Sequence, residues 1–524
     1  MSTASSRPFA DNPPSSDIRL AVEATTATRP TFGPDVTLTC EAVERIARKT
    51  EQLAFTTRAG EAIESSARTL RAAHERGDEI YGLTTGYGPH VRYAADEDPR
   101  LQGAGLIAHL GAGWGALASP LIVRATLAVR CQAIAQGHSG IDPIAAAAFL
   151  DLLNHEVCPA IPEIGSVGAS GDLIPLAHAA RVLTGEGWVL KEDGSRGPAT
   201  EALAAVGLEP ISLTGRDALA LVNGTSFMTA YASIAAARSA RLLRAAEDLS
   251  GWVYRSLGAR DQALDARLHE ARGHGGQVRS AARIAEDAYS EGEFEDLSRP
   301  LQEVYSIRCA PQFLGASRDQ IEHAARTIER EINGVNDNPV VCGSAEQPAV
   351  LHGGNFQGQQ IAFAADTINT AITQIGLLME RQLDAVLSPD LNGGAPLLLA
   401  WQPGATSGMA GAQITATAIA AEMRRSATPS SVQTMPTNGR NQDVVSMGTM
   451  AARVVYEQTE RLAAILAVQA IALEQLNFLR RRDRAPGCEA LAPSWLPEIE
   501  GFEADRALHD DIQRVSQSIL GTPA

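Results

Sequence analysis

The chain has little of what marks several large classes of protein. Its 524 residues include only six cysteines, which are scattered without a CxxC pair: Cys40, Cys131, Cys158, Cys309, Cys342 and Cys488. This argues against a disulfide framework or a zinc ribbon and favours a reducing compartment, so we expect a cytoplasmic protein. Basic residues are in the minority, with 44 Lys plus Arg against 61 Asp plus Glu and a net charge of −17. Because an acidic protein repels phosphate, we expect no nucleic-acid partner and no anionic membrane, but a small-molecule substrate.

Long hydrophobic runs are lacking as well. The first residues, MSTASSRPFADNPPSS, contain no apolar segment of the kind that a secretory signal needs. The longest uncharged stretch, residues 218–237, contains Asn223, Gly224 and several Ser and Thr residues. A lipid-facing span rarely carries so many polar groups, so this stretch predicts a buried helix with a polar end in a soluble protein.

Helical spacing of apolar residues is what the chain has in abundance. In residues 317–333 one apolar stripe is formed by Ile321, Ala324, Ala325, Ile328 and Ile332, and Ser317 is a candidate N-cap. Residues 450–479 repeat apolar residues every three or four positions, whereas strand-like alternation is scarce throughout. We therefore predict a mainly α fold with long bundled helices, preceded by a mobile tail over residues 1–35, which are rich in Ser, Thr and Pro.

A glycine-rich loop between predicted helices contains the tripeptide Ala169-Ser170-Gly171. A serine next to glycine suggests a hydrolase nucleophile elbow, but that motif needs glycine where this chain has Asp172. A plain turn is the ordinary interpretation. A third is chemical: the backbone nitrogen of Gly171 attacks the carbonyl carbon of Ala169, and loss of water, including the Ser170 hydroxyl, leaves an electrophilic methylene on a five-membered ring. Glycine supplies the backbone freedom that this attack requires.

The tripeptide does not stand alone, because the sequence resembles the histidine/phenylalanine/tyrosine ammonia-lyase family. Segments similar to those of the family follow in order over some 400 residues: YGLTTGYG (81–88), GASGDLIPLAH (168–178), ALVNGTS (220–226), RGHGGQ (272–277), YSIRCAPQ (305–312), NDNP (336–339), HGGNFQGQ (352–359) and NQDVVSMG (441–448). The resemblance implies that Ala169, Ser170 and Gly171 form the family's methylidene-imidazolone (MIO) by themselves, with no metal and no diffusible cofactor.

The resemblance also implies catalytic and substrate-binding roles. Tyr81, by itself an ordinary loop aromatic, would remove the β-proton of the substrate, which requires an environment that lowers its pKa. Arg308, by itself a surface charge, would hold the substrate carboxylate, and Tyr305, three residues earlier on the same helical turn, would contact the ring or the leaving amine. From the residues alone, Asn223 is equally a helix cap and Phe356 a core residue. The residues implied to line the substrate pocket are Gly88, His109, Leu110, Leu173, Asn223, Arg308, Phe356, Asn441 and Gln442.

Two histidines raise the question of a metal site. His269, Glu270 and His274 give the spacing H-E-x3-H, one residue longer than the zinc helix motif, so we expect no metal. His274 lies in the segment RGHGGQ, which is similar to a family loop, and we interpret it as structural.

The position of His109 indicates the substrate. Tyrosine-type members of the family carry His-Leu where this chain has His109-Leu110, and an imidazole can hydrogen-bond the para-hydroxyl of tyrosine. Histidine-type members carry glutamate where this chain has Gln442. Tyr87 and Trp114 depart from the usual pattern of the tyrosine-type members. Family aminomutases also carry tyrosine at the position of Tyr87.

The resemblance thus implies an ammonia-lyase/fumarase-like fold, with an MIO-bearing N-terminal domain (36–235), a central helical bundle (236–480) and a C-terminal segment (481–524). It also implies a homotetramer whose sites combine loops from three subunits. We expect conversion of L-tyrosine to p-coumarate and ammonia. The alternatives are a phenylalanine ammonia-lyase, a tyrosine or phenylalanine 2,3-aminomutase, and an inactive helical scaffold.

Overall fold

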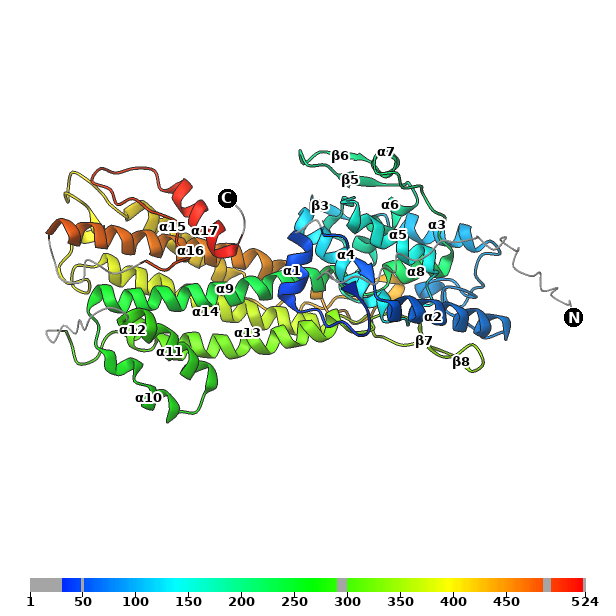
Figure 1. Ribbon diagram of the computed structural model, residues 1–524, viewed down its shortest axis with the longest axis horizontal. Coiled ribbons are helices and arrows are strands. Elements are labelled where there is room, and N and C mark those ends of the chain that lie inside the picture. The colour runs from blue at the N-terminus through cyan, green and yellow to red at the C-terminus, as the bar shows by residue number, and fades with distance from the viewer. Residues whose placement is uncertain (1–30, 49–50, 290–298, 484–491, 522–524) are drawn as a thin grey trace, which may run out of the picture.

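A computed structural model describes residues 31–48, 51–289, 299–483 and 492–521. Within these ranges the protein is mainly α, and long helices lie side by side along one half of the molecule (Figure 1). The helices of this bundle are α1 (Cys40–Arg48), α9 (Ser226–Leu257), α10 (Ala266–Glu270), α11 (Gly275–Tyr289), α12 (Tyr305–Arg308), α13 (Ala310–Ile332), α14 (Gln359–Leu387), α15 (Ala410–Arg425), α16 (Gly448–Asp483) and α17 (His509–Leu520). The predicted fold class is confirmed.

Shorter helices and four small sheets make up the other half, a loop-rich lobe (Figure 1). Its helices are α2 (Thr57–Glu75), α3 (Pro99–His109), α4 (Pro120–Ala135), α5 (Pro143–Asn154), α6 (Leu173–Leu183), α7 (Ala199–Ala205) and α8 (Gly215–Val222). Each described sheet has two strands: β1 (Thr31–Phe32) runs parallel to β2 (Ala54–Phe55), and three antiparallel pairs join β3 (Trp114–Leu117) to β4 (Pro162–Ile164), β5 (Trp188–Leu190) to β6 (Arg196–Pro198) and β7 (Val340–Gly343) to β8 (Pro348–Leu351).

The longest helices follow their apolar stripes. In α13, Ile321, Ala324, Ile328 and Ile332 are buried, as the spacing predicts, whereas Ala325 is only partly buried. The predicted N-cap Ser317 is wrong, because α13 begins at Ala310 and the Ser317 hydroxyl donates within the helix to the carbonyl of Phe313 at 3.0 Å. The stretch 218–237 is buried but is not one helix, since α8 ends at Val222 and α9 begins at Ser226.

The expected domain boundaries fall inside helices. Residue 235 lies within α9 and residue 480 within α16, so the same helices continue across both boundaries. Residues 1–30 of the expected tail lie outside the described residues. For residues 31–35 the expected mobile tail is wrong, because Phe32 is fully buried and β1 pairs with β2.

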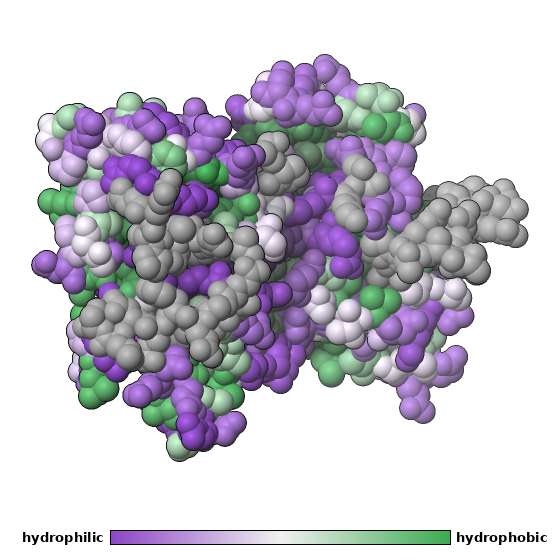
Figure 2. Space-filling model, turned by 60° about the vertical axis from the view of Figure 1, so that its left-hand side comes forward, coloured by the Kyte–Doolittle hydropathy of each residue, from purple (hydrophilic) through white to green (hydrophobic). Residues whose placement is uncertain are grey.

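Two described helices are long and apolar enough to cross a membrane by length and composition alone: α14 and the segment Gly448–Arg482 of α16. Of their most apolar windows, 67% and 83% are buried inside the protein. Hydrophilic residues cover most of the face shown in Figure 2, with smaller hydrophobic areas between them. Burial within the bundle accounts for the apolar composition of both helices.

Candidate active site

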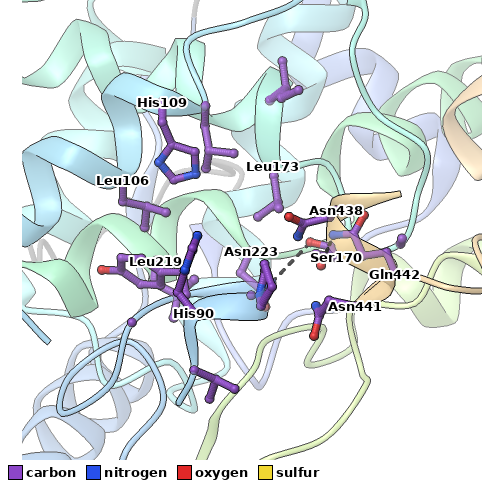
Figure 3. A pocket seen from close by; sticks show the side chains of 18 of the residues that line it. His90, Leu106, His109, Ser170, Leu173, Leu219, Asn223, Asn438, Asn441 and Gln442 are labelled. Atoms are coloured by element: carbon purple, nitrogen blue, oxygen red, sulfur yellow. Dashed lines mark hydrogen bonds between the residues drawn. The ribbon is translucent and has the colours of Figure 1, made fainter. Parts of the chain in front are cut away.

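A cavity of about 1080 Å³ lies in the lobe, where three loops meet. The first is the base loop, residues 81–95; the second contains Ala169, Ser170 and Gly171; the third is the amide loop, residues 437–442. Figure 3 shows Asn223, Asn438, Asn441 and Gln442 gathered around Ser170, whereas His109 and Leu106 lie toward the opposite end. The cavity therefore has a polar end at the tripeptide, and an end at α3 that is lined by both polar and apolar side chains.

The tripeptide is held in a tight turn that only glycine permits. Gly171 has φ +67°, and a Cβ there would lie 2.1 Å from the carbonyl oxygen of Gly224. The next amide, that of Asp172, donates to this same oxygen at 2.7 Å. Gly168 has φ +68°, and its Cβ would lie 2.4 Å from Ser446 Oγ. Side chains are excluded at both positions by sterics as well as by backbone conformation.

Polar groups surround Ser170. Gln442 Nε2 donates to Ser170 Oγ at 2.8 Å, and Asn223 Nδ2 donates to the Ser170 carbonyl at 3.2 Å (Figure 3). Asn223 is also the C-cap of α8, as the interpretation from the residues alone expects. Its buried Oδ1 has no hydrogen-bond partner among the described residues. A turn that has no room for side chains at Gly168 and Gly171, a serine hydroxyl at a cavity and an amide oxygen without a partner fit an MIO formed from Ala169, Ser170 and Gly171.

Asp172 forms a buried network beside the tripeptide. Its Oδ1 accepts from the hydroxyls of Ser166 (2.8 Å) and Thr449 (2.6 Å), and its Oδ2 accepts from the Met228 amide (2.8 Å). Burial raises the pKa of Asp172 to about 6, and these hydrogen bonds oppose the rise. In the sequence, Asp172 argues only against a hydrolase elbow, because its hydrogen-bond partners lie too far apart along the chain for a pattern to reveal them.

Tyr81 lies in the cavity with its side chain tied to its own loop. The amide of Gly88 donates to Tyr81 Oη at 2.7 Å, and the ring packs edge-on against Tyr87 at 6.2 Å between centroids. Burial raises the pKa of Tyr81, whereas the Gly88 amide lowers it. The net direction in a single chain is upward, opposite to the lowering that a catalytic base requires.

His109 ends α3 and lines the far end of the cavity (Figure 3). Its Nδ1 lies 3.0 Å from the Gly105 carbonyl oxygen. A carbonyl can only accept, so Nδ1 carries a proton, and in the neutral imidazole Nε2 is left as an acceptor. Leu110 and Leu173, both predicted to line the pocket, do so together with Leu106 and Leu219.

The amide loop presents its side chains through an unusual backbone. Asn441 and Gln442 line the cavity as predicted, as does Phe356. Asn438 lines it too and was not predicted. Asn438 and Arg440 have positive φ angles of 50° and 65°, on either side of Gly439. The Asn-Gly pair at 438–439 is a turn signal that would have pointed to this residue.

Tyr305 and Arg308 do not reach the cavity of their own chain. They form α12, which lies in the bundle half of Figure 1, away from α6 and α8. The Arg308 guanidinium carbon lies 4.8 Å from the centre of the Tyr305 ring, so the two share a face as predicted. The Tyr305 side chain is 68% exposed.

The two histidines of the H-E-x3-H segment differ in environment. His269 is buried, with Nε2 3.0 Å from the Ala263 carbonyl oxygen and Nδ1 2.9 Å from Gln277 Nε2. His274, which we interpreted as structural, is exposed. No group of three or more His, Cys, Asp or Glu residues suited to a metal ion occurs within the described ranges.

Comparisons with known proteins agree with this geometry. Residues 38–494 match the family model described as aromatic amino acid lyase. The chain is 40% identical to a tyrosine ammonia-lyase of Cereibacter sphaeroides, over 87% of this chain and 91% of that one. It is 36% identical to an MIO-dependent tyrosine 2,3-aminomutase of Streptomyces globisporus, over 92% and 93% of the two chains. A crystal structure of tyrosine aminomutase from S. globisporus superposes with a TM-score of 0.85 at 34% identity, covering 94% of this chain and 97% of that one. The chain therefore belongs to the aromatic amino acid lyase family, whose carbon–nitrogen lyases and aminomutases it resembles over nearly its whole length.

Proposed function

We propose that the protein is a tyrosine ammonia-lyase, which eliminates ammonia from L-tyrosine to give p-coumarate. The observation that carries this proposal is the contact between His109 Nδ1 and the Gly105 carbonyl oxygen at the far end of the cavity. With Nδ1–H directed at the Gly105 carbonyl, Nε2 is available to accept from the para-hydroxyl of a substrate whose other end lies at Ser170. The tyrosine ammonia-lyase of C. sphaeroides among the relatives supports the same substrate.

The chain's own residues supply binding and proton transfer. An MIO formed from Ala169, Ser170 and Gly171 supplies an electrophile at the polar end of the cavity. Asn223 and Gln442 hold the tripeptide there, and the leucines around His109 enclose the aromatic ring of the substrate. Tyr81 accepts the β-proton on its Oη, where the Gly88 amide stabilises the phenolate.

Tyr81 needs a further positive charge to become a base near neutral pH. We infer a homotetramer in which Arg308 and Tyr305 of the partner subunit enter the cavity, because both lie far from it in their own chain. A guanidinium there would bind the substrate carboxylate and lower the pKa of Tyr81. A cytoplasmic location is supported by the five described cysteines, which are all free.

The test is to incubate the purified protein separately with L-tyrosine, L-phenylalanine and L-histidine while following the ultraviolet absorbance of the conjugated acid. A rise that is fastest with tyrosine is expected. In Ser170→Ala, turnover, the cofactor-linked absorbance and the loss of two waters in the intact mass are all expected to vanish. Wild-type activity in that variant would refute the proposal. No rise in absorbance with any of the three substrates would favour an aminomutase, an unusual substrate or an inactive helical scaffold.

A 2,3-aminomutase is the second candidate. It is favoured by the S. globisporus relative and by Tyr87, which occupies a position where family aminomutases also carry tyrosine. The two functions share their catalytic groups and differ in whether ammonia is added back at the β-carbon. Chromatography of the products distinguishes them, because β-tyrosine forms only in the aminomutase reaction.

A further inference from the structure

We propose that Tyr87 is a positioning residue for Tyr81, which it places by tying the base loop to α8. The inference rests on the proposed function, in which Tyr81 removes the β-proton. It concerns a hydroxyl that lies outside the reaction itself and that hydrogen-bonds to the backbone of a neighbouring helix.

The base loop is bonded mainly to itself. Gly86 N donates to the Tyr93 carbonyl at 3.0 Å and Ala95 N donates to the Thr84 carbonyl at 3.1 Å, so the loop folds back as one unit. A unit of this kind moves as a body unless it is attached elsewhere. Its attachments decide where the Tyr81 hydroxyl lies relative to Ser170.

The Tyr87 side chain makes one of those attachments. Its Oη donates to the Gly215 carbonyl at 3.0 Å, at the first residue of α8. Burial raises the pKa of Tyr87, so the hydroxyl stays protonated and remains a donor. Elsewhere, Gln102 Nε2 donates to the Thr85 carbonyl at 3.1 Å and Tyr81 N donates to His352 Nε2 at 3.1 Å.

The Tyr87 ring also fixes the backbone next to the base. It packs edge-on against the Tyr81 ring, and a Cβ on Gly82 would lie 2.8 Å from Tyr87 Cε1 and 2.7 Å from Leu219 Cδ2. The backbone at Gly82 is therefore packed between the Tyr87 ring and α8. A shift of the Tyr87 ring would shift Tyr81 with it.

The same helix holds the tripeptide at its other end. Asn223, the residue just after α8, donates to the Ser170 carbonyl, and the eight residues of α8 span about 12 Å. A capping box between Thr214 and Asp217 fixes the start of the helix. The helix thus sets the separation between base and tripeptide, with the Tyr87 hydroxyl attaching one and the Asn223 amide the other.

The experiment compares Tyr87→Phe with Tyr93→Phe in the full-length protein. Tyr87→Phe removes one hydroxyl and keeps the ring, whereas Tyr93 lies in the same loop with a 68% exposed side chain. The kcat of Tyr87→Phe is expected to fall about three- to tenfold with KM within about twofold, on the scale of one lost hydrogen bond. The isotope effect on kcat with β-deuterated substrate is expected to rise, and the cofactor-linked absorbance to stay unchanged. Tyr93→Phe is expected to match the wild type.

Equal kcat values and isotope effects in the two variants would overturn the inference. So would a lower melting temperature of Tyr87→Phe with an unchanged isotope effect, because that is the result of a purely structural role. The variant Tyr81→Phe tests the catalytic role of Tyr81 separately from the positioning role of Tyr87. Wild-type turnover in Tyr81→Phe would refute the proposed role of Tyr81, and the inference with it. An inactive Tyr81→Phe beside a wild-type-like Tyr87→Phe would refute the inference alone.

Discussion

Ser170 is hydrogen-bonded to side chains from two distant parts of the chain. Its tripeptide could be identified from sequence because cyclisation needs a specific order of residue types. The amides of Asn223 and Gln442 followed from the family resemblance. The hydrogen-bond network of Asp172 could not be predicted, because Ser166, Met228 and Thr449 meet this carboxyl only in the folded protein.

Asp172 is expected to make stability depend on pH. Its pKa of about 6 in the folded protein lies above the ordinary value of 3.8, so the folded state binds the proton more tightly. The stability from this binding is fully present below about pH 4 and is lost as the pH rises to about 6. Asp172→Asn does not titrate, so its stability relative to the parent should increase over that range by about 3 kcal/mol. Urea denaturation of both proteins in a Ser170→Ala background, at equal concentration, measures this difference without any contribution from cyclisation. A difference that is constant from pH 4 to 7 would contradict it.

His109→Phe is expected to exchange the substrate preference. The variant removes the acceptor Nε2, so the tyrosine hydroxyl would be buried without a partner, and kcat/KM for tyrosine should fall at least about tenfold. The value for phenylalanine should rise or hold, which serves as the internal control. An unchanged ratio of the two values would mean that His109 does not contact the substrate, as in a phenylalanine ammonia-lyase.

Between α8 and α9, three residues form a turn that the sequence pattern did not reveal. Residues 218–237 have helical composition throughout, but Asn223, Gly224 and Thr225 leave the helix because the Gly224 carbonyl accepts from Asp172 N. Arg130 closes the turn from the other side, with its guanidinium bonded to Asp337 and to the Ala220 carbonyl. Local helix propensity does not reflect such long-range contacts, so the break between α8 and α9 could not be predicted from it.

Gly224→Ala tests this turn. A Cβ there would lie 2.2 Å from Arg130 Nη1 and 2.6 Å from Asn336 Oδ1, and φ is +153°. Because Arg130 is fully buried and already bonded, we expect unfolding free energy to fall by about 1–3 kcal/mol and turnover to fall as Asn223 moves from Ser170. Gly394→Ala is the control, since Gly394 has φ +84° with nothing within 4 Å of the added carbon. Equal losses in the two variants would mean that the collision with Arg130 is unimportant.

The buried faces of helices could be predicted from regularly spaced apolar residues, but the residues at which the helices begin were harder to predict. The stripe on α13 identified its buried face, because one helix packs that face along its whole length. Ser317 failed as its start because α13 begins at Ala310, with Pro311 in its first turn, which was the better signal. The loops of the site lie between these helices, and only the resemblance indicated that they meet.

At the scale of the whole molecule, the residues that we propose to share one active site lie far apart within a single chain. The tripeptide precedes α6 in the lobe, whereas Tyr305 and Arg308 lie on α12 in the bundle (Figure 1). Helix α9 connects the two regions. It begins just after Asn223, and near its end Tyr254 Oη donates to the Ile307 carbonyl of α12 at 3.0 Å. Gln382 of α14 also holds α12, through the Ser306 carbonyl at 2.9 Å.

Mixing two inactive variants tests whether sites are shared. Tyr81→Phe and Arg308→Ala are each expected to be inactive as pure proteins. If both residues come from different subunits, random co-assembly of equal amounts gives about a quarter of the sites both native residues and restores activity accordingly. Co-expression with two affinity tags and assay of the doubly purified protein measures this. The Tyr81→Phe, Arg308→Ala double variant, co-expressed with itself, is the matched control, and no recovery in the mixed protein would contradict shared sites.

The 32 residues of α9 span about 48 Å, from the turn at Asn223 to the region where Tyr254 donates to the backbone of α12. In the proposed assembly each chain contributes to one active centre at either end of this helix, so the length of α9 would help to set the spacing between neighbouring centres. An insertion or deletion within α9 would therefore displace every centre at once, and compensation would require equal changes in α14 and α16. Variation in chain length among homologous enzymes should accordingly accumulate in the surface loops and termini and leave this helix unaltered.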